Sequence, residues 1–272
     1  SGRTVEINGD IDVDLSMTPQ IGISGITLSN ADWARNSQMF KAEKLAFSIR
    51  LRELLHRRVV LPEIILTKPE IDLERNAANQ ANWVFDEGVI ADAAVPDDRG
   101  SFPIIGRLII EDGRMQYRDA NRDFDFVAQL ASIRGKGRQP GAYDESISVK
   151  AKGQAQGKPL DMTLIAGSLI DLRDEDQLYP VDFKMVSGDT HIALKGHIDQ
   201  PLALRGLDLT LQLRGPNLER LYALTGIPLP DSPPYQLTGK LQHTTGKWRV
   251  QSLAGSVGDS DISGNLEVHT AD

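Results

Sequence analysis

The sequence lacks cysteine, has few aromatic residues and contains no apolar run long enough to cross a membrane. The absence of cysteine excludes a disulfide scaffold, thiolate zinc sites and cysteine-based catalysis. Aromatic residues make up only 6% of the chain, so aliphatic side chains must supply most of any hydrophobic core. The densest apolar segment, Val59–Leu66, is interrupted by Pro62 and Glu63 and is far shorter than the roughly 20 residues of a membrane-spanning helix.

The sequence also lacks an excess of positive charge. Its formal net charge is -8 and its pI is about 5.2, which argues against nonspecific nucleic-acid binding, because that binding requires a basic surface to displace phosphate counterions. No signal peptide is present. The abrupt start at Ser1-Gly2-Arg3 favours a chain whose N-terminal segment has been removed.

The sequence is rich in alternating apolar and polar residues. In Leu207–Arg214, four leucines alternate with Asp, Thr, Gln and Arg, and successive residues of a strand point to opposite faces of a sheet. The alternation recurs from Val5 to Val268, and no long helices separate the strands. We therefore expect a mainly β fold: a large antiparallel sheet, curved into a U or taco shape, with one apolar face and a few short helices. The alternative is a compact β-sandwich, in which the same apolar faces form a dry core.

Turn and cap residues predict how the chain is divided. Asp112-Gly113 stands between two strand-like segments and predicts a β-hairpin. A short helix is expected near residues 217–225, with Asn217 as its N-cap and Gly226 as its stop. Residues 86–101 are polar and rich in turn residues. We expect an N-terminal β region at 1–88, a linker or mobile loop at 89–100, and a C-terminal β region at 101–272. An ordered loop on one continuous sheet is the alternative at 89–100.

No arrangement of side chains typical of catalysis or metal binding is found. His191 and His197 would lie on one strand face about 20 Å apart, too far to share a metal ion. The acidic segment at 171–176 lacks the glycine of a calcium loop. A glycan hydrolase that uses Asp171 and Asp174 as paired carboxylates is a weak alternative, because no polar and aromatic motif surrounds them. We therefore expect no catalytic residue, no metal site and no cofactor.

Three segments, in order along the chain, resemble the AsmA family. The first is the N-terminal run from Val5 to Phe85, especially Val59–Arg75, which ends in the pattern P-x-I-x-L-x-R and is followed by Asn82-Trp83. The second is Gly106–Asp119, which ends in Tyr-Arg-Asp like a hairpin that recurs in that family. The third is Leu229–Val268, which contains Leu-Pro, Pro-Tyr and a Gly-Asp-Ser-Asp turn. Together the three segments extend from Val5 to Val268, along most of the length of the chain.

The resemblance implies an inner-membrane protein of Gram-negative bacteria with a long periplasmic β structure. Such a protein is anchored by an N-terminal helix that this chain does not contain, so we expect a short member of the family or an excised fragment. The resemblance further implies a non-enzymatic role in which phospholipid is bound along a hydrophobic groove and moved toward the outer membrane. Phospholipid and the membrane are thus the expected partners, along with outer-membrane or periplasmic proteins; nucleic acid is not expected.

The alternation and the resemblance together suggest which residues would line a lipid groove. We expect the in-phase aliphatic and aromatic residues of the C-terminal region to hold acyl chains, with headgroups at the open edge, near residues such as Lys150, Lys195 or Arg214 if these lie at a rim. The expected lining residues are Leu160, Met162, Leu164, Phe183, Ile192, Leu194, Leu207, Leu209, Leu211, Leu213, Leu237 and Leu241. The alternative function is an assembly factor for outer-membrane proteins, which would bind protein strands at the sheet edges.

Overall fold

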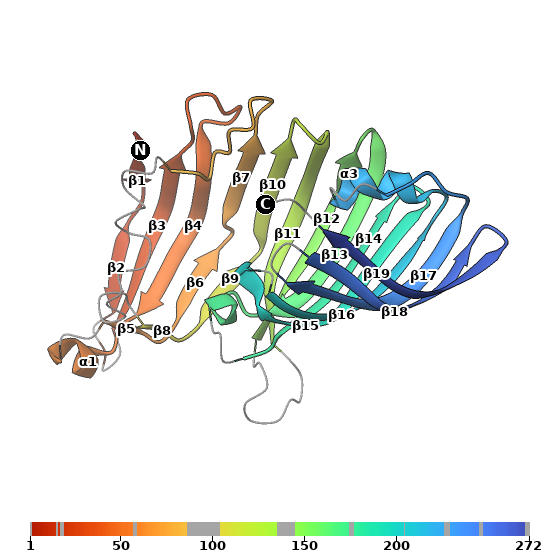
Figure 1. Cartoon of the computed structure of the whole chain (residues 1–272). Helices are drawn as coiled ribbons and strands as arrows, with labels where there is room; N and C mark the ends of the chain where they lie inside the picture. The colour runs from red at the N-terminus through yellow and green to blue at the C-terminus, as the bar shows by residue number, and fades with distance from the viewer. Residues whose placement is uncertain are drawn as a thin grey trace. The chain divides into compact units, whose positions relative to one another are not determined.

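The computed structural model describes residues 2–14, 16, 19–56, 59–85, 104–134, 145–173, 177–203, 205–225, 229–244 and 247–269. Within these residues the chain forms one large, mostly antiparallel sheet of 17 strands that does not close on itself, with very little helix (Figure 1). A separate two-stranded sheet pairs β5 (Val60–Leu61) with β8 (Ile104–Ile105). The expected mainly β fold is therefore confirmed, and no second large sheet of a β-sandwich is seen in the described part.

The chain divides into two compact units, Ser1–Ser132 and Ile133–Asp272, and each is described separately. The linker expected at residues 89–100 lies outside the described residues. We refer to the two parts as unit 1 and unit 2.

Unit 1 is built around β3 and β4, which pair along most of their length. The short strands β1 and β2 both pair with β3, and β4 pairs with β6 and β7 on its other side. The strands of this unit are β1 (Val5–Ile7), β2 (Ile11–Asp14), β3 (Gln20–Ser29), β4 (Gln38–Ser48), β6 (Ile64–Thr67), β7 (Glu70–Arg75), β9 (Leu108–Glu111), β10 (Gly113–Asp119) and β11 (Phe124–Arg134), the last reaching the boundary.

The prediction of a hairpin at Asp112-Gly113 is wrong. Strand β9 pairs in parallel with β6, β10 pairs in parallel with β7, and both pairings have the same residue offset. The chain therefore continues through Asp112 in the same direction. Asp112 has a φ of 51°, and Lys68 at the same level of the neighbouring strand has a φ of 46°. An Asp-Gly pair indicates a residue with a left-handed backbone. That backbone conformation occurs at a kink within a strand as well as in the turn of a hairpin.

A third residue with positive φ lies at the same level of unit 1. Gly25, with a φ of 66°, lies in β3 opposite Glu43 of β4, and Glu43 lies opposite Lys68. The Lys68 ammonium contacts the Glu43 carboxylate at 2.7 Å, and this hydrogen bond raises the pKa of Lys68. The pairing of β3 with β4 continues past Gly25 without a change of register, so Gly25 adds a positive φ but no bulge against β4.

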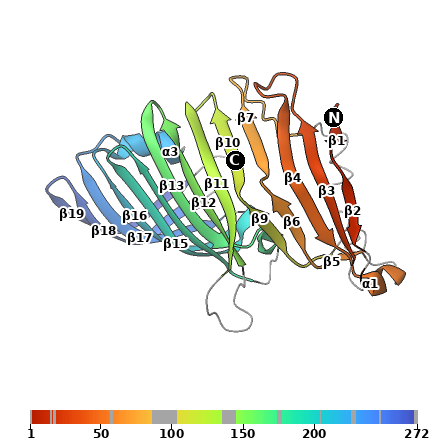
Figure 2. The ribbon, with the colours of Figure 1, turned by 180° about the vertical axis from the view of Figure 1, so that it is seen from behind.

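Unit 2 is an antiparallel meander in which each strand pairs with the next along the chain. Tight turns join several of them, such as Gln156-Gly157, where both residues have positive φ. Figures 1 and 2 show that the meander is strongly curved. Its strands are β12 (Glu145–Ala155), β13 (Lys158–Gly167), β14 (Tyr179–Ser187), β15 (Thr190–Gln200), β16 (Arg205–Gly215), β17 (Tyr235–Thr244), β18 (Lys247–Val257) and β19 (Ser260–His269).

The helices are all short, and among the described residues none is long and apolar enough to cross a membrane. The helix predicted near 217–225 is confirmed: the Asn217 side chain accepts a hydrogen bond from the Glu219 amide at 2.8 Å. Its expected stop, Gly226, lies outside the described residues. The helical segments are α1 (Leu51–Leu55), η1 (Asp171–Arg173), η2 (Pro201–Ala203), η3 (Leu218–Arg220) and α3 (Leu221–Thr225).

Candidate functional site

The strand registers of unit 2 bring all the expected lining residues to one face of the sheet. Directly paired residues of antiparallel strands point to the same face. Met162 pairs with Met185, which pairs with Ile192, which in turn pairs with Leu213. Leu213 then pairs with Leu237. The parallel row through Leu164, Phe183, Leu194 and Leu211 is built in the same way. We call this surface the apolar face of unit 2.

Burial divides the expected lining residues into two groups. Leu160 is 1% exposed and Leu209 is 3% exposed, values that a flat, uncovered sheet face would not give. Leu209 packs with Ile198 and Leu207, and Trp248 covers this cluster. Fully buried positions are Leu160, Ile192, Leu207, Leu209, Leu211 and Leu237, whereas Met162, Leu164, Phe183, Leu194, Leu213 and Leu241 are half-buried. The half-buried group supplies the accessible apolar surface, and its contact with lipid stays a prediction.

Several residues of the apolar face of unit 2 are not among the lining residues expected from the sequence. Met185 is 6% exposed and follows the same alternation as Phe183, so its phase alone identifies it. Val250 pairs with Leu241 and is buried, but the pairing of β18 shifts between Val250 and Leu253. That irregularity breaks the period of two, so alternation does not reveal Val250.

The expected headgroup contacts lie on the other face. Lys150 pairs with Thr163, Lys195 with Asp182 and Arg214 with His191, and all of these positions are out of phase with the apolar rows. The Lys195 ammonium lies 3.5 Å from the Asp182 carboxylate. These cations therefore stand within strands on the polar face of unit 2.

The candidate metal and catalytic residues form no centre in the described part. No three His, Asp or Glu side chains there are close enough to hold a metal ion. Asp171 lies in η1, where its carboxylate accepts from the Ser168 amide at 3.3 Å. Its proposed catalytic partner, Asp174, lies outside the described residues.

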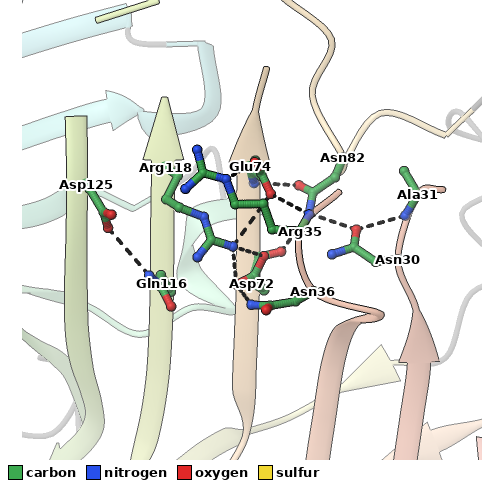
Figure 3. A network of polar contacts seen from close by, with 10 residues as sticks. All are labelled: Asn30, Ala31, Arg35, Asn36, Asp72, Glu74, Asn82, Gln116, Arg118 and Asp125. Carbon is green, nitrogen blue, oxygen red and sulfur yellow. Dashed lines mark hydrogen bonds and ion pairs between the residues drawn. The ribbon is translucent and has the colours of Figure 1, made fainter. Parts of the chain in front are cut away.

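Unit 1 contains a buried polar network that the sequence did not reveal (Figure 3). Asn82 is 0% exposed. Its Nδ2 donates to the Asp72 carbonyl at 2.8 Å and its Oδ1 accepts from the Glu74 amide at 2.9 Å. The amide side chain thus pairs with the edge of β7 as a neighbouring strand would. Asn82 Nδ2 also donates to Asn30 Oδ1 at 3.0 Å, which joins the network to the segment after β3.

Two buried carboxylates of β7 are neutralised inside this network. Arg118 of β10 donates to both Asp72 carboxylate oxygens at 2.9 Å and lies 3.6 Å from Glu74. Asn36 donates to Asp72 as well, and the Arg35 guanidinium lies 3.3 Å from Glu74. Each buried acid therefore has a cationic partner, as buried charge requires. Sequence alternation gives no sign that residues 30–37 cover Asp72 and Glu74.

The segments that resemble a family motif have local structural roles. Asp119 is 4% exposed and accepts from the amides of Asn121 and Arg122, so it fixes the turn between β10 and β11. The Tyr117 ring lies 5.9 Å from Trp83. The Arg75 guanidinium stands 5.2 Å from the Trp83 ring centre. These motif residues hold strand ends and turns in place.

Comparison with known proteins agrees with this structural pattern. The model of the AsmA family matches residues 1–158, which include the whole polar network. The chain belongs to the AsmA family. It is similar to the AsmA family protein YhjG of Escherichia coli (strain K12), with 29% identity over 267 residues. That similarity covers 91% of this chain and 39% of the relative, so the chain spans about two fifths of the relative's length. No solved structure matches.

Proposed function

We propose that the apolar face of unit 2 binds phospholipid acyl chains, as part of a non-enzymatic, inner-membrane-anchored periplasmic protein that supports lipid transport to the outer membrane. The observation that carries the proposal is the register: five adjacent strands, β13 to β17, place their aliphatic residues on one face. Family membership supports a role in the cell envelope.

The physical chemistry of this face suits a sliding ligand. Burial of an acyl chain contributes roughly 0.8 kcal/mol per CH₂. Because the hydrophobic effect is non-directional, a chain loses little when it moves from one row of side chains to the next. The half-buried residues Met162, Leu164 and Phe183 form one accessible patch across β13 and β14. No proton transfer or nucleophile is needed for this activity.

Lipid analysis of matched variants tests the proposal. Leu164 is half-buried on the apolar face, and its neighbour Thr163 is exposed on the polar face of the same strand. Protein purified from bacterial cells and examined by native mass spectrometry should carry phospholipid. Leu164→Asn should lower the lipid-bound fraction severalfold, whereas Thr163→Asn should leave it unchanged. A lipid-free wild-type protein, or equal effects of the two substitutions, contradicts the proposal.

One observation favours the alternative of a protein-assembly factor. Ile11 and Val13 of β2 are 59% and 53% exposed, and within the described residues β2 pairs only with β3. An exposed apolar edge strand can accept a strand from another protein. Crosslinking from Val13 that yields protein adducts, with no lipid bound at unit 2, would favour this second function.

A further inference from the structure

The polar face of unit 2 contains a hollow of about 380 Å³. Four adjacent strands line it, each with three successive residues: 184–186 of β14, 191–193 of β15, 212–214 of β16 and 236–238 of β17. The regular register makes these segments three parallel rows across the sheet. The hollow is therefore an extended feature of the sheet surface, within one unit.

The rows show on which face the hollow opens. The middle row contains Met185, Ile192 and Leu237, which are buried on the apolar face with 6%, 6% and 7% exposure. The two flanking rows point the opposite way, because successive strand residues alternate between faces. Side chains such as Lys184 and Arg214 thus surround the hollow, and the backbone of the middle row forms its floor.

The charge of this hollow differs from that of its surroundings. Its lining contains Lys184, His191 and Arg214 but no carboxylate. Nearby cations on the same face have acidic partners: Lys195 pairs with Asp182 and Lys240 with Asp208. Among the described residues, neither Lys184 nor Arg214 has a carboxylate within ion-pair distance. In a chain of net charge -8, this is a local excess of positive charge.

The remaining lining groups suit an oxyanion. Arg214 donates to His191 Nε2 at 2.9 Å, which holds the guanidinium beside the imidazole ring. Gln212 and Gln236 add exposed amide donors beside Arg214. The planar guanidinium matches two oxygens of a phosphate group, and a lysine adds a point charge. Ala193 leaves space between the rows.

We propose that this hollow binds the phosphate group of a phosphate ester. The source is a soluble phosphate ester or the headgroup of a membrane phospholipid, and both offer the same oxyanion. The site is separate from the proposed acyl-chain surface, because the sheet lies between them. A lipid whose chains lie on the apolar face of unit 2 does not reach the hollow through the sheet.

Binding of two probes to charge-matched variants tests this proposal. Glycerol 3-phosphate is titrated by calorimetry, and vesicles of phosphatidylglycerol or phosphatidylcholine are tested by co-sedimentation. Arg214→Gln and Lys184→Gln should each weaken binding about tenfold, as expected for loss of one charge-assisted hydrogen bond. Lys195→Gln and Lys240→Gln remove the same charge from the same face and should change binding by less than about twofold. Urea unfolding confirms that each variant is folded.

Each outcome bears directly on the proposal. Saturable binding of glycerol 3-phosphate with this variant pattern supports it and identifies soluble esters as ligands. The same pattern with phosphatidylglycerol vesicles alone supports it and identifies a lipid headgroup. Failure of both probes, or equal losses in all four variants, overturns it. Leu164→Asn, which tests the acyl-chain proposal, should leave both probes unaffected, so the two proposals fail separately.

Discussion

At the scale of single residues, two buried tyrosines of unit 2 differ in one hydrogen bond. The Tyr179 hydroxyl donates to the Gly167 carbonyl at 2.9 Å. The Tyr235 hydroxyl is buried and has no hydrogen-bond partner among the described residues. Each ring packs against a glycine, Gly167 or Gly215, where an added Cβ would lie within 2.8 Å or 2.7 Å of the tyrosine. The two rings therefore pack alike, whereas only the Tyr179 hydroxyl has a hydrogen-bond partner among the described residues.

Replacing each tyrosine with phenylalanine isolates that difference. Tyr179→Phe should lower the free energy of unfolding by about 1 kcal/mol, because the Gly167 carbonyl loses its donor. Tyr235→Phe should leave it unchanged or raise it by up to about 1 kcal/mol, because an unsatisfied buried hydroxyl is removed. Urea denaturation measures both, and a loss in Tyr235→Phe as large as in Tyr179→Phe contradicts the prediction.

Tyr235 also makes the free energy of unfolding depend on pH in the alkaline range. Burial raises the pKa of Tyr235 to about 12 from its ordinary value of 10.0. The folded protein then holds the phenol proton more tightly than the unfolded chain. The resulting stability is fully present below pH 10 and is lost as pH rises toward 12. Tyr235→Phe should reduce the loss of stability over this range, as measured by urea midpoints at several pH values. An unchanged pH profile contradicts this cause.

Asn82 is a second residue whose replacement should change the stability of the protein strongly. Its side chain satisfies two backbone groups of β7 and contacts Asn30 inside the fold. Asn82→Ala should lower the free energy of unfolding by about 2–4 kcal/mol, because buried polar groups lose their partners. Asn121→Ala, which removes an exposed hydrogen bond to the Asn76 carbonyl, should cost less than about 1 kcal/mol. Similar losses in the two variants would rule out a structural role for the Asn82 amide.

At the scale of elements, the chain of unit 1 is kinked at one level, between β6 and β7 and between β9 and β10. Asp112 and Lys68 take the left-handed backbone that makes this possible. Sequence alternation predicted strands with apolar and polar faces. It did not distinguish a kink from a hairpin at Asp112-Gly113, because both require the same local backbone and differ only in which strands lie alongside.

Substitutions at Asp112 test the kink. Asp112→Gly should leave stability unchanged or increase it slightly, since glycine adopts positive φ without strain. Asp112→Val should lower the free energy of unfolding by about 1–2 kcal/mol, because a β-branched side chain clashes in that conformation. Gln129→Val, at an exposed position of β11, controls for the hydrophobic replacement. Equal stability of the Gly and Val variants, measured in urea, would exclude a strained kink.

At the scale of the whole molecule, the sequence predicted the fold class better than the pairing of strands. The alternation at Leu207–Arg214 is compatible with an open sheet and with a sandwich, and the family resemblance favoured the open sheet that the structure shows. The parallel pairing of β6 and β7 with β9 and β10 was not predictable, because it joins segments about 44 residues apart. The polar network was missed for a similar reason: Arg118 and Asp72 meet only through that pairing.

If the apolar face of unit 2 binds acyl chains, lipid must lie against it in the cell. A photoactivatable amino acid at Phe183, half-buried on that face, is compared with the same group at Lys184, exposed on the polar face. Irradiation of living cells, followed by mass spectrometry of the purified protein, identifies what each position contacts. We predict phospholipid adducts through the acyl chain at Phe183 and no acyl-chain adducts at Lys184, which lines the proposed phosphate site. Absence of lipid adducts at Phe183, or acyl-chain adducts at both positions alike, would contradict the account.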